Sequence, residues 1–116
     1  MTVPSPAPRD RRTLARQARD AFPAMGVYAV RSGSTVRVGA SRNVHGTLNR
    51  IQFELRLGSH PDKALQAEWE LAPETFRFDV LDLVTERADP DFDYAGELRV
   101  LEQLHREELQ ATGVRP

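Results

Sequence analysis

The order of strand-like and helix-like segments along this chain of 116 residues predicts a small mixed α+β domain. Two short apolar runs, 26–30 and 36–40, are joined by the polar stretch 31–35, which contains glycine and predicts a β-hairpin. Segments of helical periodicity precede and follow this hairpin. The strands are too few and too close together for repeated βαβ units, so a doubly wound sheet is not favoured.

The chain begins with two segments that stand apart from the main domain. Residues 1–8 hold three prolines among small residues and predict a disordered tail. Residues 9–23 predict an N-terminal helix that Pro23 ends, because a proline disfavours helical backbone in the residue before it. Its apolar residues fall at every fourth position, on one stripe: Leu14, Ala18 and Phe22. The main domain is therefore expected to span 24–113.

Two helices are predicted after the hairpin. The first spans 44–57, with Asn43 as its N-cap and Gly58 as its C-cap. Its apolar positions form one stripe: Val44, Leu48, Ile51 and Leu55. Ser59 is expected to cap the second helix, with Pro61 in its first turn. That second helix runs through Ala64, Leu65 and Trp69.

A third strand and a last helix complete the chain. Residues 75–81 alternate between apolar and polar side chains, as expected of a half-buried strand. Residues 85–93 form an acidic loop, and 94–110 predict a helix. The positions of this helix that we expect to be buried are Leu98, Leu101 and Leu104.

Composition narrows the class of protein. Hydrophobic residues make up 40% and charged residues 28% of the chain, which is typical of a soluble globular domain. No apolar run approaches about 18 residues, so no membrane span is predicted. The absence of cysteine excludes a disulfide scaffold and a thiolate zinc site, and it fits a cytoplasmic location.

Charge is distributed unevenly along the chain. Residues 1–69 hold 11 Lys and Arg against 5 Asp and Glu, whereas 70–116 hold 5 against 12. A basic half attracts phosphate, so DNA is the expected partner, unless the fold interleaves the two halves. The basic residues expected to contact nucleic acid are Arg31, Arg42, Arg50 and Arg56. The N-terminal helix carries five Arg and two Asp, and it offers a surface for a homodimer or a protein partner.

Two tripeptides in the hairpin resemble the pair that names the GIY-YIG nuclease family. Gly26-Val27-Tyr28 matches the first, with valine in place of isoleucine, and Arg37-Val38-Gly39 stands at the second. Further segments follow in the order that one bacterial branch shows: Leu48-Asn49-Arg50, Gly58-Ser59-His60, Leu65-Gln66-Ala67-Glu68-Trp69, Phe76 to Leu81, and Leu101-Glu102. The resemblance covers about residues 24–110. It implies a small three-stranded antiparallel sheet flanked by helices, with the N-terminal helix as an addition.

The resemblance also implies an activity and a set of site residues. Family members hydrolyse DNA phosphodiesters with one divalent metal, Mg²⁺ or Mn²⁺, whose ligand would be Glu102 here. Tyr28 would help to activate water, Arg37 or Arg50 would neutralise the phosphate, and His60 stands where some members carry histidine. Each has a structural alternative: Tyr28 as a strand aromatic, Glu102 on a solvated helix face, and His60 as a surface histidine.

The chain also departs from the family's pattern. Arg37 replaces the second tyrosine, Thr47 stands where the catalytic arginine is expected, and the C-terminal asparagine is absent. Losing one preorganised transition-state donor costs roughly 10²–10³ in rate. Two hypotheses therefore stay open: a metal-dependent endonuclease with an altered site, and a non-catalytic DNA-binding or protein-interaction domain.

Overall fold

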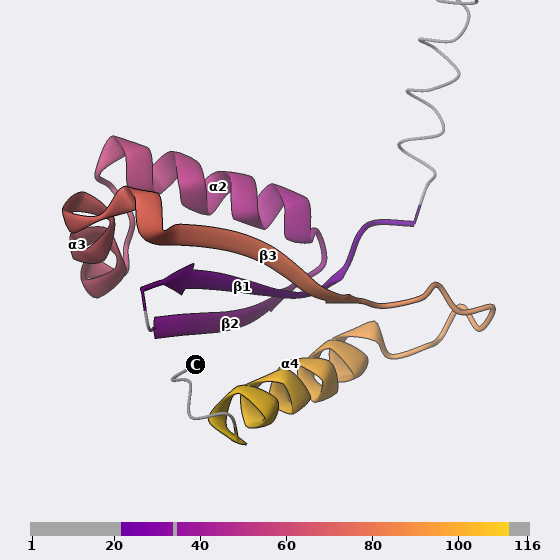
Figure 1. Cartoon of the computed structure of the whole chain (residues 1–116). Coiled ribbons are helices and arrows are strands. Elements are labelled where there is room, and N and C mark those ends of the chain that lie inside the picture. The colour runs from indigo at the N-terminus through magenta and orange to yellow at the C-terminus, as the bar shows by residue number, and fades with distance from the viewer. Residues whose placement is uncertain (1–21, 34, 112–116) are drawn as a thin grey trace, which may run out of the picture.

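The structure, a computed structural model, describes residues 22–33 and 35–111. Figure 1 shows its elements in chain order: β1 (Gly26–Ser32), β2 (Thr35–Ser41), α2 (Val44–Leu57), α3 (Lys63–Leu71), a 3₁₀ turn (Pro73–Thr75), β3 (Phe76–Leu83) and α4 (Tyr94–Ala111). The predicted tail and nearly all of the predicted N-terminal helix lie outside the described residues. Phe22 and Pro23 are in irregular backbone. None of the described helices is long and apolar enough to cross a membrane.

The three strands form one antiparallel sheet in the order β2-β1-β3. The predicted hairpin is confirmed, but its connection is shorter than the expected stretch 31–35, because Ser32 pairs with Thr35 at the ends of the strands. Gly33, at the start of the turn, has φ 56°, a left-handed conformation that favours glycine. Such a tight turn matches the right-handed twist of the two strands and lets the ladder continue to their ends.

Helices cover both faces of the sheet, α2 and α3 on one side and α4 on the other (Figure 1). Successive side chains of β1 point to opposite faces, so the central strand contributes to two cores. Val30 packs against three buried residues of α2 and one of α3: Leu48, Ile51, Leu55 and Leu65. Val27 and Ala29 pack toward α4, where Leu101 closes the second core. The predicted α+β class and the three-stranded antiparallel sheet with flanking helices are confirmed.

The burial of α4 differs from the expected pattern at one position. Leu98 is 7% exposed and Leu101 is half-buried, but Leu104 is 49% exposed, so the prediction that Leu104 is buried is wrong. Only one stripe of α4 faces the sheet, and it continues through His105 to Leu109. His105 Nε2 lies within hydrogen-bond distance of Asp82 Oδ2, at 3.2 Å, and this contact anchors the stripe to β3.

The helix ends follow local rules, with one correction. Asn43 caps α2 by accepting a hydrogen bond from the Gly46 amide at 3.0 Å, and Gly58 ends it with φ 75°, both as predicted. The expected Ser59 cap is wrong, because Asp62 caps α3 by accepting from the Leu65 amide at 3.1 Å. Pro61 therefore precedes α3 and does not lie in its first turn. The negative charge of an aspartate at this position also interacts favourably with the positive end of the helix dipole.

Candidate functional site

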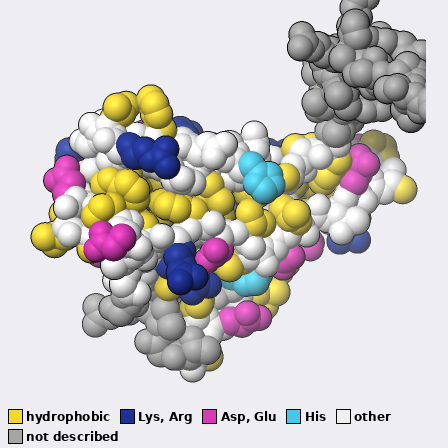
Figure 2. Space-filling model, turned by 45° about the horizontal axis from the view of Figure 1, so that its top comes forward, with side chains coloured by type: hydrophobic (Ala, Val, Ile, Leu, Met, Phe, Trp, Pro, Cys, Tyr) yellow, Lys and Arg dark blue, Asp and Glu magenta, His cyan; other side chains and the backbone are white. Residues whose placement is uncertain are grey.

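A pocket of about 320 Å³ lies where β1, β2, α2 and the loop before α3 meet. Four residues predicted from the sequence line it: Tyr28, Arg37, Arg50 and His60. Val30, Ile51 and Leu65 form its apolar floor, and Glu54 and Asp62 add carboxylates. Figure 2 shows one face of the molecule, where a band of apolar side chains is bordered by basic, acidic and histidine side chains. The surface is therefore of mixed charge, not uniformly basic.

Tyr28 crosses from β1 over its pairing partner on β2, Gly39. A Cβ atom at Gly39 would collide with the Tyr28 hydroxyl and lie 2.5 Å from Cζ, so the ring position requires glycine there. Burial raises the pKa of Tyr28 above its ordinary value, and the Glu102 carboxylate raises it further, while Arg50 and Arg106 oppose them. The phenol therefore keeps its proton at neutral pH and stands within electrostatic reach of charges from two helices.

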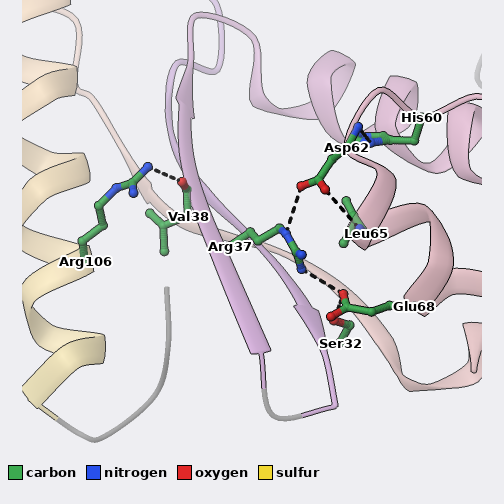
Figure 3. A network of polar contacts seen from close by, with 8 residues as sticks. All are labelled: Ser32, Arg37, Val38, His60, Asp62, Leu65, Glu68 and Arg106. Carbon is green, nitrogen blue, oxygen red and sulfur yellow. Dashed lines mark hydrogen bonds and ion pairs between the residues drawn. The ribbon is translucent and has the colours of Figure 1, made fainter.

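Arg37 points from β2 toward α3 and contacts two carboxylates (Figure 3). Its Nε lies 3.2 Å from Asp62 Oδ2, and its Nη1 lies 2.9 Å from Glu68 Oε2. The Ser32 hydroxyl donates to the same Glu68 oxygen at 2.9 Å. The side chain is 27% exposed, so these contacts are partly shielded from water. The charge of Arg37 is thus balanced within the protein, and the residue ties β2 to α3.

His60 is fixed in the loop between α2 and α3. Its Nδ1 accepts a hydrogen bond from the Asp62 amide at 3.0 Å, so the neutral ring carries its proton on Nε2. The His60 amide donates to Gln66 Oε1 at 3.1 Å, and the buried Gln66 side chain donates to Leu55 O at 3.0 Å. The loop is thereby held against the end of α2, and the imidazole lines the pocket.

Arg50 is the most accessible cation of the pocket. Its side chain is 69% exposed and lies 3.9 Å from Glu54, an i,i+4 contact that stabilises little in water. Thr47, where an arginine was expected, instead shares a 2.7 Å hydrogen bond with the Ser41 hydroxyl. The guanidinium of Arg50 is therefore the one on α2 that lines this pocket in the described part of the chain.

Glu102 lies on α4, which covers the sheet face opposite α2 and α3, but its charge reaches Tyr28 of the pocket. It pairs with Arg106 one turn later, and Arg106 Nη2 donates to Val38 O on β2 at 2.8 Å. Among the described residues, no group of three or more His, Cys, Asp or Glu is placed to hold a metal. Mg²⁺ usually takes one or two carboxylates and completes its shell with water and substrate phosphate. The single carboxylate of Glu102 fits a metal of that kind, bound together with substrate.

The four arginines expected to contact nucleic acid do not gather in one patch. Arg31 lies on the same side of β1 as Ala29 and is paired with Asp79 on β3 at 2.9 Å. Arg42 is exposed between β2 and α2, and Arg56 is exposed in the last turn of α2. Of the four, Arg50 lines the pocket.

Three polar residues of the site region were missed by sequence reasoning. Asp62 and Glu68 bind Arg37, and Arg106 binds Glu102. The Asp62 contact spans 25 residues and the Glu68 contact 31, so no local pattern indicates them. The Arg106 contact with Glu102 is an i,i+4 pair, and its spacing was a usable signal.

Comparisons with known proteins agree with this architecture. No family model matches the chain, and no curated protein matches it. Among solved structures, the chain is similar to the catalytic domain of homing endonuclease I-TevI, with a TM-score of 0.59 and 17% identity. The match covers 78% of this chain and 94% of that domain. At this identity the likeness shows the fold: the resemblance to a GIY-YIG nuclease domain is confirmed as a three-stranded antiparallel sheet with flanking helices.

Proposed function

We propose that this domain binds DNA at the pocket and hydrolyses a phosphodiester bond with one divalent cation. One observation carries the proposal: Tyr28, Arg37, Arg50 and His60, chosen from sequence, line a single pocket. The fold supports it, because it is similar to the catalytic domain of a homing endonuclease. The likeness alone does not assign a reaction, since one fold hosts many functions.

Each residue has a role that its environment suits. Arg50, exposed at the pocket, contacts a phosphate, whereas Arg37 lines the same pocket with its charge balanced by Asp62 and Glu68. His60 offers its Nε2 proton as a hydrogen-bond donor to a phosphate or leaving oxygen. Tyr28 orients the attacking water through its hydroxyl group. Bound at Glu102, Mg²⁺ or Mn²⁺ would polarise the phosphate and stabilise the leaving oxygen.

Electrostatics link Tyr28 to Glu102. The carboxylate is one of the two causes that raise the pKa of Tyr28. Neutralising that carboxylate removes this cause and leaves the opposing effect of Arg50 and Arg106. Burial, the larger cause of the raised pKa, would remain. A cation held by Glu102 would therefore lower the pKa of Tyr28 only in part.

Nicking of supercoiled plasmid in Mg²⁺ or Mn²⁺ tests the activity. We expect Glu102→Gln to lower the rate by roughly 10²–10³, the usual cost of removing a key electrostatic group. Glu107→Gln is the matched control, because Glu107 lies on the same helix but borders a different groove. Its rate should equal that of the parent. Equal nicking by Glu102→Gln and the parent would sink the assignment of the metal site.

A second candidate is a non-catalytic domain that binds DNA or another protein. Two observations favour it: Thr47 occupies the expected arginine position, and Arg37 is engaged by two carboxylates. Retardation of DNA in a gel that weakens steeply with salt, without nicking, would support DNA binding alone. Absence of both, with self-association of the full chain in sedimentation experiments, would support a homodimer or protein-interaction role for the N-terminal segment.

A further inference from the structure

Arg106 occupies an unusual position beside the candidate site. It extends from α4 to the edge strand β2, where Nη2 donates to the Val38 carbonyl oxygen at 2.8 Å (Figure 3). The same nitrogen donates to Glu102 Oε2. The side chain is 40% exposed, and its charge acts on Tyr28. Arg106 thus contacts both Glu102 and the edge of the sheet, and its charge reaches Tyr28.

The partner of Arg106 distinguishes it from the other paired arginines nearby. Arg37 is held by two carboxylates, and Arg31 is held by Asp79. Those carboxylates have no role in the proposed reaction, so their arginines stay paired. Glu102 is different, because the proposed function needs its carboxylate for a divalent cation. Arg106 and the divalent cation therefore compete for the Glu102 carboxylate.

We propose that Arg106 is a phosphate-binding residue of this domain, and that it releases Glu102 when a phosphate and a divalent cation arrive together. The inference rests on the proposed function and adds a residue to it. The Val38 carbonyl keeps the guanidinium at the edge of β2 when the contact with Glu102 is lost. A guanidinium freed from one anion pairs readily with a phosphate, whose geometry it matches. Arg106 thereby replaces the cation that Thr47 cannot supply.

The exchange predicts a linkage between the two ligands. In the free protein Arg106 competes with the metal for Glu102, so metal binding is weakened. DNA supplies Arg106 with a new partner, which frees Glu102 and strengthens metal binding. By reciprocity the metal strengthens DNA binding by the same factor, and couplings of this kind are typically 5–150-fold.

Titration of the full chain with Mn²⁺, followed by electron paramagnetic resonance of free Mn²⁺, tests the inference without measuring cleavage. Arg106→Gln is the test variant, because it keeps a polar hydrogen-bond donor on the side chain but carries no charge. We expect it to bind Mn²⁺ roughly five-fold more tightly than the parent in the absence of DNA. Arg99→Gln, the same charge change at another groove of α4, should bind as the parent does. Glu102→Gln should abolish the binding in either background.

A short duplex oligonucleotide then separates this inference from the proposed function. We expect DNA to tighten Mn²⁺ binding in the parent by about five-fold or more, and by a clearly smaller factor in Arg106→Gln. Equal Mn²⁺ affinities in parent and Arg106→Gln, or binding absent from both, overturn the inference. If the parent still nicks plasmid through Glu102 in that case, the proposed function stands without it. Circular dichroism confirms that each variant is folded.

Discussion

Substituting Gly39 by alanine tests the packing on which the candidate site rests. The new Cβ would collide with the Tyr28 hydroxyl and lie 2.5 Å from Cζ and 3.0 Å from Cε1. The ring cannot simply turn away, because it packs against the core cluster that includes Val30 and Leu48. Gly39→Ala therefore forces the aromatic ring and the neighbouring strands to shift.

The magnitude follows from two opposing effects. Overpacking of this kind costs about 1–3 kcal/mol. Replacing glycine by alanine also lowers the entropy of the unfolded chain, which stabilises by about 0.4–1 kcal/mol. The free energy of unfolding should therefore fall by about 1–2 kcal/mol. For a chain of 116 residues this lowers the Tm by roughly 4–8 °C.

A double-mutant cycle in urea or heat denaturation is the assay. Tyr28→Ala removes the ring that the new methyl group meets, so Gly39→Ala should cost little or even stabilise in that background. The coupling between the two substitutions should be about 1 kcal/mol or more. If Gly39→Ala is equally costly in both backgrounds, the glycine is needed for a reason other than the ring. If it is neutral in the parent, the described packing of Tyr28 is wrong.

Three further predictions concern stability. Arg37→Met should cost about 1–2 kcal/mol in urea denaturation, because Asp62 and Glu68 lose their shared cation, and a cost below about 0.3 kcal/mol would contradict the tie between β2 and α3. The pKa of Asp62 is held below its ordinary value of 3.8, mainly because its carboxylate accepts a hydrogen bond from the backbone amide of Leu65. Its contribution is therefore complete above about pH 5 and is lost progressively as the pH falls. Asp62→Asn should flatten the decline of Tm between about pH 5 and pH 3, and an unchanged decline would refute this. Leu98→Ala should cost about 2–4 kcal/mol and Leu104→Ala less than about 0.5 kcal/mol, and thermal melts showing equal losses would contradict the observed rotation of α4.

Local sequence patterns predicted the helices and strands, because the interactions that start, continue and end these elements act between residues close in the sequence. The apolar stripe of 44–57, the Asn43 cap and the Gly58 stop each act within a few residues of the helix they define. The hairpin likewise needs only its two runs and a turn. The same local rules predicted the wrong N-cap for α3. Ser59 and Asp62 both precede this helix, and the Asp62 side chain is the one that accepts a hydrogen bond from a free amide of its first turn.

The burial of leucines on α4 shows what hydrophobic periodicity alone does not predict. Leu98, Leu101 and Leu104 are three residues apart, and a row with this spacing winds around a helix of 3.6 residues per turn, so the three cannot all face the sheet equally. The rotation of the helix about its axis decides between them, and it depends on which side chains fit the opposite sheet face. Contacts from His105 to Asp82 and from Arg106 to Val38 fix that rotation and turn Leu104 outward.

The sequence by itself determined the fold class and the pair of strands that carries Tyr28 and Gly39. Hydrophobic alternation and turn chemistry suffice for the strand pair, because they act between near neighbours. The resemblance to the GIY-YIG family indicated the four residues that line one pocket. Only the tertiary structure decided the partners of the charges. Arg37 is bound by the carboxylates of Asp62, which caps α3, and of Glu68 in α3, and Arg106 contacts Val38, which is 68 residues away in the sequence. Such contacts depend on how separate elements pack, so a charged residue's type predicts what it can bind but not what it meets.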